Sequence, residues 1–174
     1  MQIRTYLDKD LKAIAEIYNE AIALGGVTMD HYDYAPEDIA TIVKKFNHRE
    51  TILVAQKDDL VIGWGIIKRY SDRPGYDVCC ETSIYFSFSA TGKGYGHSLQ
   101  SALLEKVKDF GYHHVVAKIL ATNPQSIRFH QRFGFEIVGI QKEIGYHQGK
   151  WLDVAILQLI FPDIVPIISD QAGK

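Results

Sequence analysis

The segment 91–96, TGKGYG, is the part of the sequence best suited to holding a charged ligand. It follows an apolar run that ends near Phe88 and precedes an amphipathic segment. Amide N–H groups exposed at the start of a helix, with no Cβ to keep a ligand away, form a site for a phosphate or pyrophosphate. The spacing fits neither common nucleotide motif, because Lys93 is followed by Gly94 and the residue three beyond Gly94 is His97. The sequence predicts a pyrophosphate loop of another kind, with a merely flexible turn as the alternative.

A second candidate is Glu81, which interrupts the apolar run from Val78 to Phe88. A carboxylate is expensive to bury without a purpose. Beside a reacting group it can remove a proton from an incoming nucleophile, a general-base effect that is typically worth ~10²–10⁴ in rate. The alternative is an ordinary strand residue on the solvent-facing side.

The remaining reactive side chains predict no further chemistry. Cys79 and Cys80 are neighbours, which on a strand point to opposite faces and cannot bridge without strain. A nucleophilic thiol needs a nearby base, and no His adjoins either residue in sequence, so we expect two buried thiols in a reducing compartment. The seven His show no ligand spacing. We predict no metal.

Length and composition limit the class of protein. The chain has 174 residues, of which 47% are hydrophobic and 23% charged, which suits one domain with its own core. With 19 Lys and Arg against 21 Asp and Glu, the net charge of −2 gives no general attraction to nucleic acid or anionic lipid. The start of the chain is charged rather than apolar, and no apolar run approaches the ~20 residues that span a bilayer. We expect a cytoplasmic protein without nucleic-acid or membrane partners.

Hydrophobic periodicity predicts the elements that position these residues, in an α+β order. After a strand at 2–7, one helix starts behind Asp8 and ends at Gly25-Gly26, and a second starts at Pro36. The helix that follows the glycine-rich segment ends at Gly111 and should connect two parallel strands. The other predicted strands are 51–56, 60–70, 76–88, 113–120, 135–146 and 150–160, with a short helix at 124–132. We expect one domain at 1–161 and a tail at 162–174.

The alternate spacing of Gly92, Gly94 and Gly96 between a strand and a helix resembles the signature of the GNAT superfamily of N-acetyltransferases, although Thr91 replaces its first Gln or Arg. Five further motifs, in the right order, resemble the phosphinothricin and methionine sulfoximine acetyltransferases within that superfamily, over residues 3 to 161. They are Ile17–Asn19, Glu81–Tyr85, Asn123–Ser126 with Phe129-His130, Phe133–Phe135, and Gly145–Val154.

This resemblance implies the GNAT fold, a central mixed and mostly antiparallel seven-stranded sheet flanked by about four helices. It implies that the strands 76–88 and 113–120 splay apart, so that the pantetheine of acetyl-CoA lies between them. The implied activity is direct transfer of an acetyl group from acetyl-CoA, without metal, to the α-amino group of a small amino-acid analogue. It also implies a homodimer, for which the final strands offer an apolar surface.

The resemblance assigns roles to particular residues. Glu81 would be the base and His130 would protonate the leaving thiolate, although a lone helix His is often a packing residue. Asn123 would touch the donor and also fits an ordinary helix cap before Pro124. The predicted cofactor-binding residues are Phe86, Phe88, Gly92, Lys93, Gly94, Tyr95, Gly96, His97, Asn123 and Ser126.

Arg73 and Tyr76 flank the turn before the Glu81 strand and resemble the family's R-x-x-Y motif. Arg73 offers a planar fork to a substrate carboxylate, or is simply solvated. The segment 27–34 would then shape a side-chain pocket. Two other functions stay open, a non-catalytic acyl-CoA-binding regulatory module and an acetyltransferase that acts on protein amines.

Overall fold

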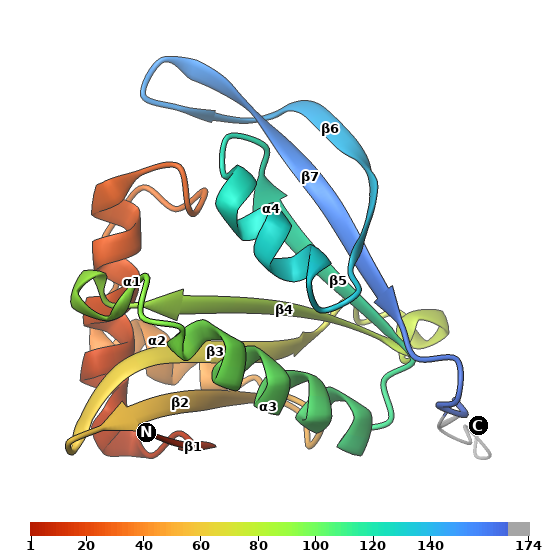
Figure 1. The fold of residues 1–174 in the computed structure, drawn as a ribbon, viewed down its shortest axis with the longest axis horizontal. Helices are drawn as coiled ribbons and strands as arrows, with labels where there is room; N and C mark the ends of the chain where they lie inside the picture. The colour runs from red at the N-terminus through yellow and green to blue at the C-terminus, as the bar shows by residue number, and fades with distance from the viewer. Residues whose placement is uncertain (167–174) are drawn as a thin grey trace.

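In the computed structural model, residues 1–166 are described, and a seven-stranded sheet lies between two layers of helices (Figure 1). The predicted α+β fold is confirmed. The helices are α1 (Leu11–Leu24), α2 (Pro36–Val43), α3 (Tyr95–Asp109) and α4 (Pro124–Gln131). The strands are β1 (Gln2–Thr5), β2 (Thr51–Lys57), β3 (Leu60–Arg69), β4 (Cys79–Phe86), β5 (His114–Leu120), β6 (Glu136–His147) and β7 (Lys150–Ile160).

The strand order is β1-β2-β3-β4-β5-β7-β6, and each neighbouring pair is antiparallel except β4 with β5. The predicted crossover is confirmed, because α3 connects these two parallel strands. A connection between parallel strands must run back to the end of the sheet at which the first strand began, which requires a long segment. The open loop at the start of α3 therefore lies at the end of β4.

Alternating side chains of the sheet form two apolar clusters, one on each face. On β2, Leu53 joins the cluster that includes α3, whereas Ile52 and Val54 join the cluster that includes α1 and α2. From α3, Leu99 and Leu103 are fully buried. Since burial of one such side chain contributes roughly 1.5–3 kcal/mol, both helix layers are firmly anchored to the sheet.

The predicted start of the first helix is wrong by two residues. The segment Asp8–Asp10 forms a 3-10 turn, and α1 begins only at Leu11. Asp10 is buried because its carboxylate pairs with Arg4 at 2.6 Å and accepts the amide of Leu7 at 2.7 Å. This contact joins β1 to α1, and capping patterns in a sequence do not reveal it.

The β6–β7 hairpin extends beyond the helix layers at one end of the sheet (Figure 1). It exposes the large apolar side chains Ile137, Val138, Ile140, Ile144, Tyr146 and Trp151. Residues 162–166 form neither helix nor strand, and the remainder of the predicted tail, 167–174, lies outside the described residues. Over residues 1–166, no helix has the length and apolar character needed to cross a membrane.

Candidate active site

The parallel strands β4 and β5 separate partway along their length. They pair at three positions, and the last of these joins Glu81 to Val116. Beyond that point the described strands run on to Phe86 and Leu120 without pairing to each other, and Figure 1 shows them diverging. The predicted splay is therefore present, with Glu81 at its closed end. Main-chain groups that face such an opening lack a strand partner and are available to a ligand.

Glu81 lies across this closed end, between a lysine on each neighbouring strand. Its side chain is 21% exposed, and its Oε2 accepts a 2.7 Å hydrogen bond from Nζ of Lys118 on β5. On β3 its register partner is Lys68. The carboxylate is thus accessible, and Lys118 holds it in one orientation.

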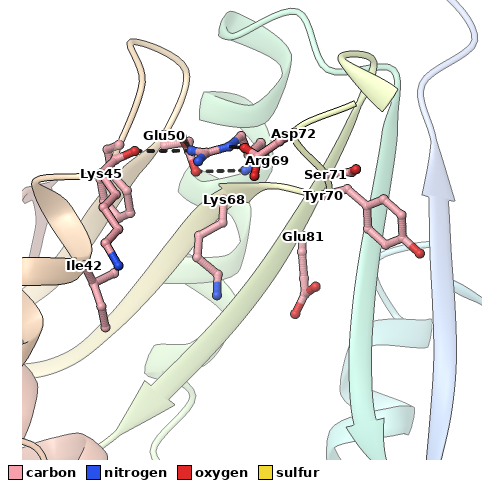
Figure 2. A pocket seen from close by; sticks show the side chains of 10 residues that line it. Ile42, Lys45, Glu50, Lys68, Arg69, Tyr70, Ser71, Asp72 and Glu81 are labelled. Atoms are coloured by element: carbon pink, nitrogen blue, oxygen red, sulfur yellow. Dashed lines mark hydrogen bonds and ion pairs between the residues drawn. The ribbon is translucent and has the colours of Figure 1, made fainter. Parts of the chain in front are cut away.

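A pocket of about 330 Å³ opens beside Glu81, between the end of α2, the end of β3 and the start of β4 (Figure 2). Figure 2 shows Lys68 and Glu81 projecting in the same direction from neighbouring strands. Pockets for small ligands span about 300–1,000 Å³, so this one suits a small molecule.

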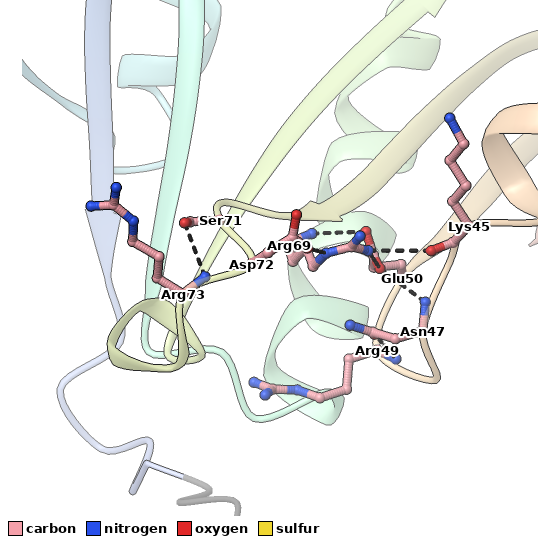
Figure 3. A network of polar contacts seen from close by, with 8 residues as sticks. All are labelled: Lys45, Asn47, Arg49, Glu50, Arg69, Ser71, Asp72 and Arg73. Atoms are coloured by element: carbon pink, nitrogen blue, oxygen red, sulfur yellow. Dashed lines mark hydrogen bonds and ion pairs between the residues drawn. The ribbon is translucent and has the colours of Figure 1, made fainter.

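A network of ion pairs forms another part of the pocket wall (Figure 3). The carboxylate of Glu50 is almost fully buried, pairs with the guanidinium of Arg69, and accepts amide hydrogen bonds from Arg69 and Asn47 at 3.0 and 2.9 Å. Hydrogen bonds from Arg69 to Asp72 and to Glu50 raise the pKa of Arg69. Arg69 also donates to the carbonyl of Lys45 after α2, at 3.3 Å. The network therefore fixes the end of α2 against β3.

The predicted substrate-binding residues lie just before β4. Tyr76 belongs to the 3-10 turn Pro74–Tyr76, so its predicted place on the strand is wrong, because β4 begins only at Cys79. The ring of Tyr76 packs on Tyr70 with centroids 5.5 Å apart, and Nζ of Lys118 lies 5.5 Å from the centre of the Tyr70 ring. These ring contacts connect Tyr76 to the lysine that bonds to the candidate base.

Arg73 lies on the same turn and is exposed. Its amide donates to Oγ of Ser71 at 3.2 Å, whereas its guanidinium forms no ion pair with any residue in the described range 1–166. Figure 3 shows the side chain extending away from the network around Arg69. Its cationic group is available to an anion, and its binding role stays a prediction.

The glycine-rich loop is open to solvent at the start of α3. Gly92 and Gly94 have φ values of 72° and 81°, where any side chain would be strained, and Gly94 caps the helix. Added Cβ atoms at these two positions would meet nothing within 4 Å. Among the described residues, the amides of 92–96 donate no hydrogen bond to the protein. Free amides at the positive end of a 15-residue helix can bind an anion, so this loop is a candidate anion site, and its ligand stays a prediction.

Other residues of this segment are also predicted to contact acetyl-CoA. Lys93 and His97 are exposed. The hydroxyl of Tyr95 accepts a 2.9 Å hydrogen bond from Nζ of Lys57. Two cations and an imidazole therefore lie near the anion site, which suits a ligand with several phosphates.

Two phenylalanines lie between the strand end and the loop. Phe86 packs against the cluster beneath α3. A Cβ added at Gly96 would lie only 3.3 Å from the ring of Phe129, so glycine lets this ring pack closely. Phe88 is 48% exposed, and its amide donates to Oε2 of Glu20 at 2.6 Å. The Phe88 amide is therefore occupied, although its ring remains accessible.

At the start of α4, Asn123 acts as the predicted helix cap. Its Oδ1 accepts the amide of Ser126 at 3.1 Å. Contact of Asn123 or Ser126 with acetyl-CoA stays a prediction.

His130, on the same helix, is buried. Only 4% of the residue is exposed, its Nδ1 lies 2.9 Å from the carbonyl of Ser126, and its ring meets Phe129 and Phe135 edge-on. Burial lowers the pKa of His130. The imidazole is thus neutral near pH 7, and its Nδ1 donates to the carbonyl of Ser126. A neutral, hydrogen-bonded ring can be buried among aromatic side chains. The acid role of His130 stays a prediction.

The segment between α1 and α2 lies against the β6–β7 hairpin. The hydroxyl of Tyr18 bonds to Asp30 at 2.5 Å and to Thr28 at 2.7 Å, and the rings of His31 and His147 are 4.2 Å apart. Burial raises the pKa of Tyr18, so this phenol stays protonated as a donor. The segment predicted to form a side-chain pocket is therefore held at both ends.

The two cysteines are free and buried, as predicted. Burial raises the pKa of Cys79 to about 11 and also raises that of Cys80, so neither forms a thiolate near neutral pH. In the described range, His, Cys, Asp and Glu form no group of three or more able to hold a metal.

Sequence reasoning missed two features of the site, Lys118 and the Glu50–Arg69 pair. The register of the β2–β3 hairpin brings the start of β2 beside the end of β3, so the hairpin pattern was the available signal for the pair. For Lys118 the signal was weaker, a single charge within the apolar run of β5.

Comparisons with known proteins agree with this geometry. Residues 3–156 match the family model described as an acetyltransferase (GNAT) domain. The chain is 35% identical over 155 residues to an L-methionine sulfoximine/L-methionine sulfone acetyltransferase of Pseudomonas paraeruginosa, covering 86% of this chain and 88% of that protein. It is 31% identical over 160 residues to the L-amino acid N-acyltransferase MnaT of Escherichia coli, covering 91% and 93%.

A solved structure gives the same result for the fold. The GNAT superfamily phosphinothricin acetyltransferase of Sinorhizobium meliloti, in complex with AcCoA, has a TM-score of 0.86 and 31% identity, covering 91% of this chain and 87% of that one. These matches confirm the predicted fold and the predicted enzyme class, an acetyl-CoA-dependent N-acetyltransferase. The chain belongs to the GNAT acetyltransferase family.

Proposed function

We propose that this enzyme acetylates the α-amino group of a small amino-acid analogue of the phosphinothricin, methionine sulfoximine or methionine sulfone type. The relatives named above support this substrate class. The observation that carries the proposal is the position of Glu81, which lies at the closed end of the β4–β5 opening and lines a small pocket. An amine bound there would meet a base and the acyl group together.

In this proposal the pyrophosphate of acetyl-CoA binds the amides of residues 92–97 at the start of α3. Lys93 adds charge, while Asn123 and Ser126 contact the pantetheine or phosphate arm. Support comes from the free amides, the helix dipole and the open space at Gly92 and Gly94. The remaining predicted donor contacts are Phe86, Phe88, Tyr95, Gly96 and His97.

Glu81 would remove a proton from the substrate ammonium, directly or through a water, before the nitrogen attacks the thioester carbonyl. Unpaired main-chain amides along the opening would polarise the carbonyl oxygen, and one well-aimed donor of this kind contributes ~3 kcal/mol. The leaving thiol has an ordinary pKa of ~8.5 and departs as a tolerable thiolate. His130 is the predicted acid, and because the one N–H of its neutral imidazole is bonded to Ser126, it must first take up a second proton.

Arg73 and Tyr76 are the proposed contacts for the substrate carboxylate. Their support is the guanidinium of Arg73, which forms no ion pair within residues 1–166, and the contact of Tyr76 with Tyr70 beside the pocket. A guanidinium offers parallel donors to a carboxylate. A pocket of about 330 Å³ also has room for a free amino acid.

The assembly proposed is a homodimer in the cytoplasm. Its support is the row of exposed apolar residues on the β6–β7 hairpin, a kind of surface that monomers rarely expose. Two free, buried thiols agree with a reducing compartment.

The test follows release of free CoA thiol from acetyl-CoA and methionine sulfone. We expect the Glu81→Gln variant to lose a factor of ~10²–10⁴ in kcat/KM. Glu105→Gln, an exposed carboxylate on α3, is the matched control and should keep its rate. If Glu81→Gln keeps its rate at every pH, the base is another group. If the wild type binds acetyl-CoA but acetylates no amino acid, polyamine or peptide, the protein is a binding module.

A further inference from the structure

The ion pair between Glu81 and Lys118 crosses the opening between β4 and β5. Glu81 belongs to the last position at which the strands pair, whereas Lys118 lies two residues beyond its partner Val116. The lysine therefore reaches back over the closed end of the opening, with Nζ 2.7 Å from Oε2 of Glu81. An amine that binds Oε2 of Glu81 must displace this ammonium.

The ammonium of Lys118 has the same charge and hydrogen-bonding groups as the ammonium of an amino acid. An α-amino acid also carries a carboxylate one carbon away from its nitrogen. We propose that a substrate zwitterion exchanges partners with this resident ion pair, its ammonium binding Glu81 and its carboxylate binding the released Lys118 in addition to the proposed contacts Arg73 and Tyr76. This inference rests on the proposed function and makes Lys118 a specificity-determining residue of that site.

The exchange leaves every charge paired, which is the physical reason for it. A plain amine that displaces Lys118 only exchanges one ion pair for another and returns the exposed lysine to solvent, with little net gain. A zwitterion replaces one Glu–Lys pair by two pairs. Peptide lysines and polyamines have no carboxylate beside the reacting nitrogen, so the site disfavours them.

The surroundings of Lys118 allow this movement. Its side chain is 46% exposed, compared with 21% for Glu81. Partly exposed ion pairs contribute little net stability, so the bond to Glu81 is easily exchanged. The ring of Tyr70, 5.5 Å from Nζ, gives the ammonium a second favourable contact while it moves.

The chemistry that follows conserves protons and charge. Glu81 takes one proton from the bound ammonium, and the neutral nitrogen forms a C–N bond to the acetyl carbon. The C–S bond then breaks, the nitrogen gives up its second proton to the departing sulfur, and CoA leaves as the thiol. Lys118 stays protonated and paired with the carboxylate. When the acetylated product leaves, Lys118 returns to Glu81 once that carboxylate has released its proton.

The experiment compares two acceptors that differ only in the carboxylate, methionine sulfone and methionine sulfone amide. We measure kcat/KM for both by thiol release in the wild type, Lys118→Met, Lys118→Arg and Lys68→Met. Loss of a charge-assisted contact should lower the acid-to-amide preference of Lys118→Met by roughly 10- to 100-fold, chiefly through KM for the acid. Lys118→Arg should keep most of the preference.

Two controls separate this inference from structural effects. Lys12→Met removes an exposed lysine on α1 and should behave as the wild type. Thermal melting of each variant checks folding, and Lys118→Gln replaces Lys118→Met if the latter fails to fold.

The outcomes distinguish this inference from the proposed function. An unchanged preference in Lys118→Met, or its loss in Lys68→Met alone, overturns the exchange while the transferase proposal stands. A wild type that acetylates neither acceptor overturns both.

Discussion

Glu81 and His130 show how surroundings decide what a titratable side chain can do. Glu81 is partly exposed, lines a pocket and bonds to an exposed lysine. His130 is buried among aromatic rings and bonded to a carbonyl of its own helix. A group that passes protons to a substrate must reach it and then exchange with solvent, which the first position permits far more readily.

We predict that His130 makes the protein less stable at mildly acidic pH. Burial lowers the pKa of His130 below its ordinary value of 6.5, so the unfolded chain gains a proton first as the pH falls. Stability is therefore lost from pH 6.5 downward, toward the lower pKa of the folded state. In urea unfolding, the free energy of unfolding should fall less between pH 7 and pH 5 for His130→Phe than for the wild type. Equal losses would contradict a buried neutral imidazole.

The same variant tests the predicted acid role. If His130 protonates the thiolate, kcat should fall by ~10² or more at unchanged KM. An unchanged kcat, measured at pH 8, would leave His130 with packing alone.

The pair between Arg4 and Asp10 gives a second prediction at this scale. Removing one partner of a buried pair leaves an uncompensated charge, so Asp10→Ala should cost roughly 3 kcal/mol in urea unfolding. The hydrogen bond from Arg4 lowers the pKa of Asp10, so this contribution is present above its ordinary pKa of 3.8 and is lost as the pH falls through the lowered value. Asp8→Ala, on the same turn but exposed, should change little.

At the scale of elements, α3 and the opening between β4 and β5 offer two different kinds of binding group. The helix is fixed by its buried apolar face, so its first turn can leave amides unpaired for an anion. The strands part just beyond Glu81, which leaves main-chain groups available to a thioester. In the proposed function, a rigid helix and an open strand edge bind the two ends of acetyl-CoA.

We predict that Gly94→Ala weakens donor binding more than it weakens the fold. A Cβ at a φ of 81° costs about 1 kcal/mol in strain and projects into the open space of the anion site. KM for acetyl-CoA should rise about tenfold, with KM for the amine unchanged. Gly111→Ala, at φ 71° just beyond the other end of α3, carries the same strain without the anion site. Equal KM values in the two variants would argue against pyrophosphate binding at this loop.

At the scale of the whole molecule, the β6–β7 hairpin is the part whose apolar side chains stay uncovered in one copy of the chain. It extends past the helix layers with a row of exposed apolar side chains, whereas both faces of the central sheet are covered (Figure 1). A second copy would cover these residues and complete the surface.

We predict that light scattering will give twice the mass of one chain in solution. Ile140→Lys places a charge on this row and should shift the equilibrium toward one copy by about 1–3 kcal/mol per copy. Lys142→Ile, nearby on the same strand, should not weaken the dimer. A wild type that stays a single copy at all concentrations would contradict the proposed assembly.

Local patterns in the sequence were sufficient for much of this structure. The cap at Asn123, the proline start of α2 and the central crossover follow from rules that act between near neighbours, and all are confirmed. Boundaries were less accurate, because contacts such as that of Asp10 with Arg4 override local preference.

The sequence by itself determined the order of elements and the open glycine loop, because alternation, capping and φ > 0 are properties of short segments. Only the tertiary structure decided that Lys118 meets Glu81, since these residues are 37 positions apart and belong to strands that pair briefly before parting. It also decided that Glu50 and Arg69 close one wall of the pocket and that His130 is buried. Such contacts depend on register and on the angle between strands, which arise from the packing of the whole sheet.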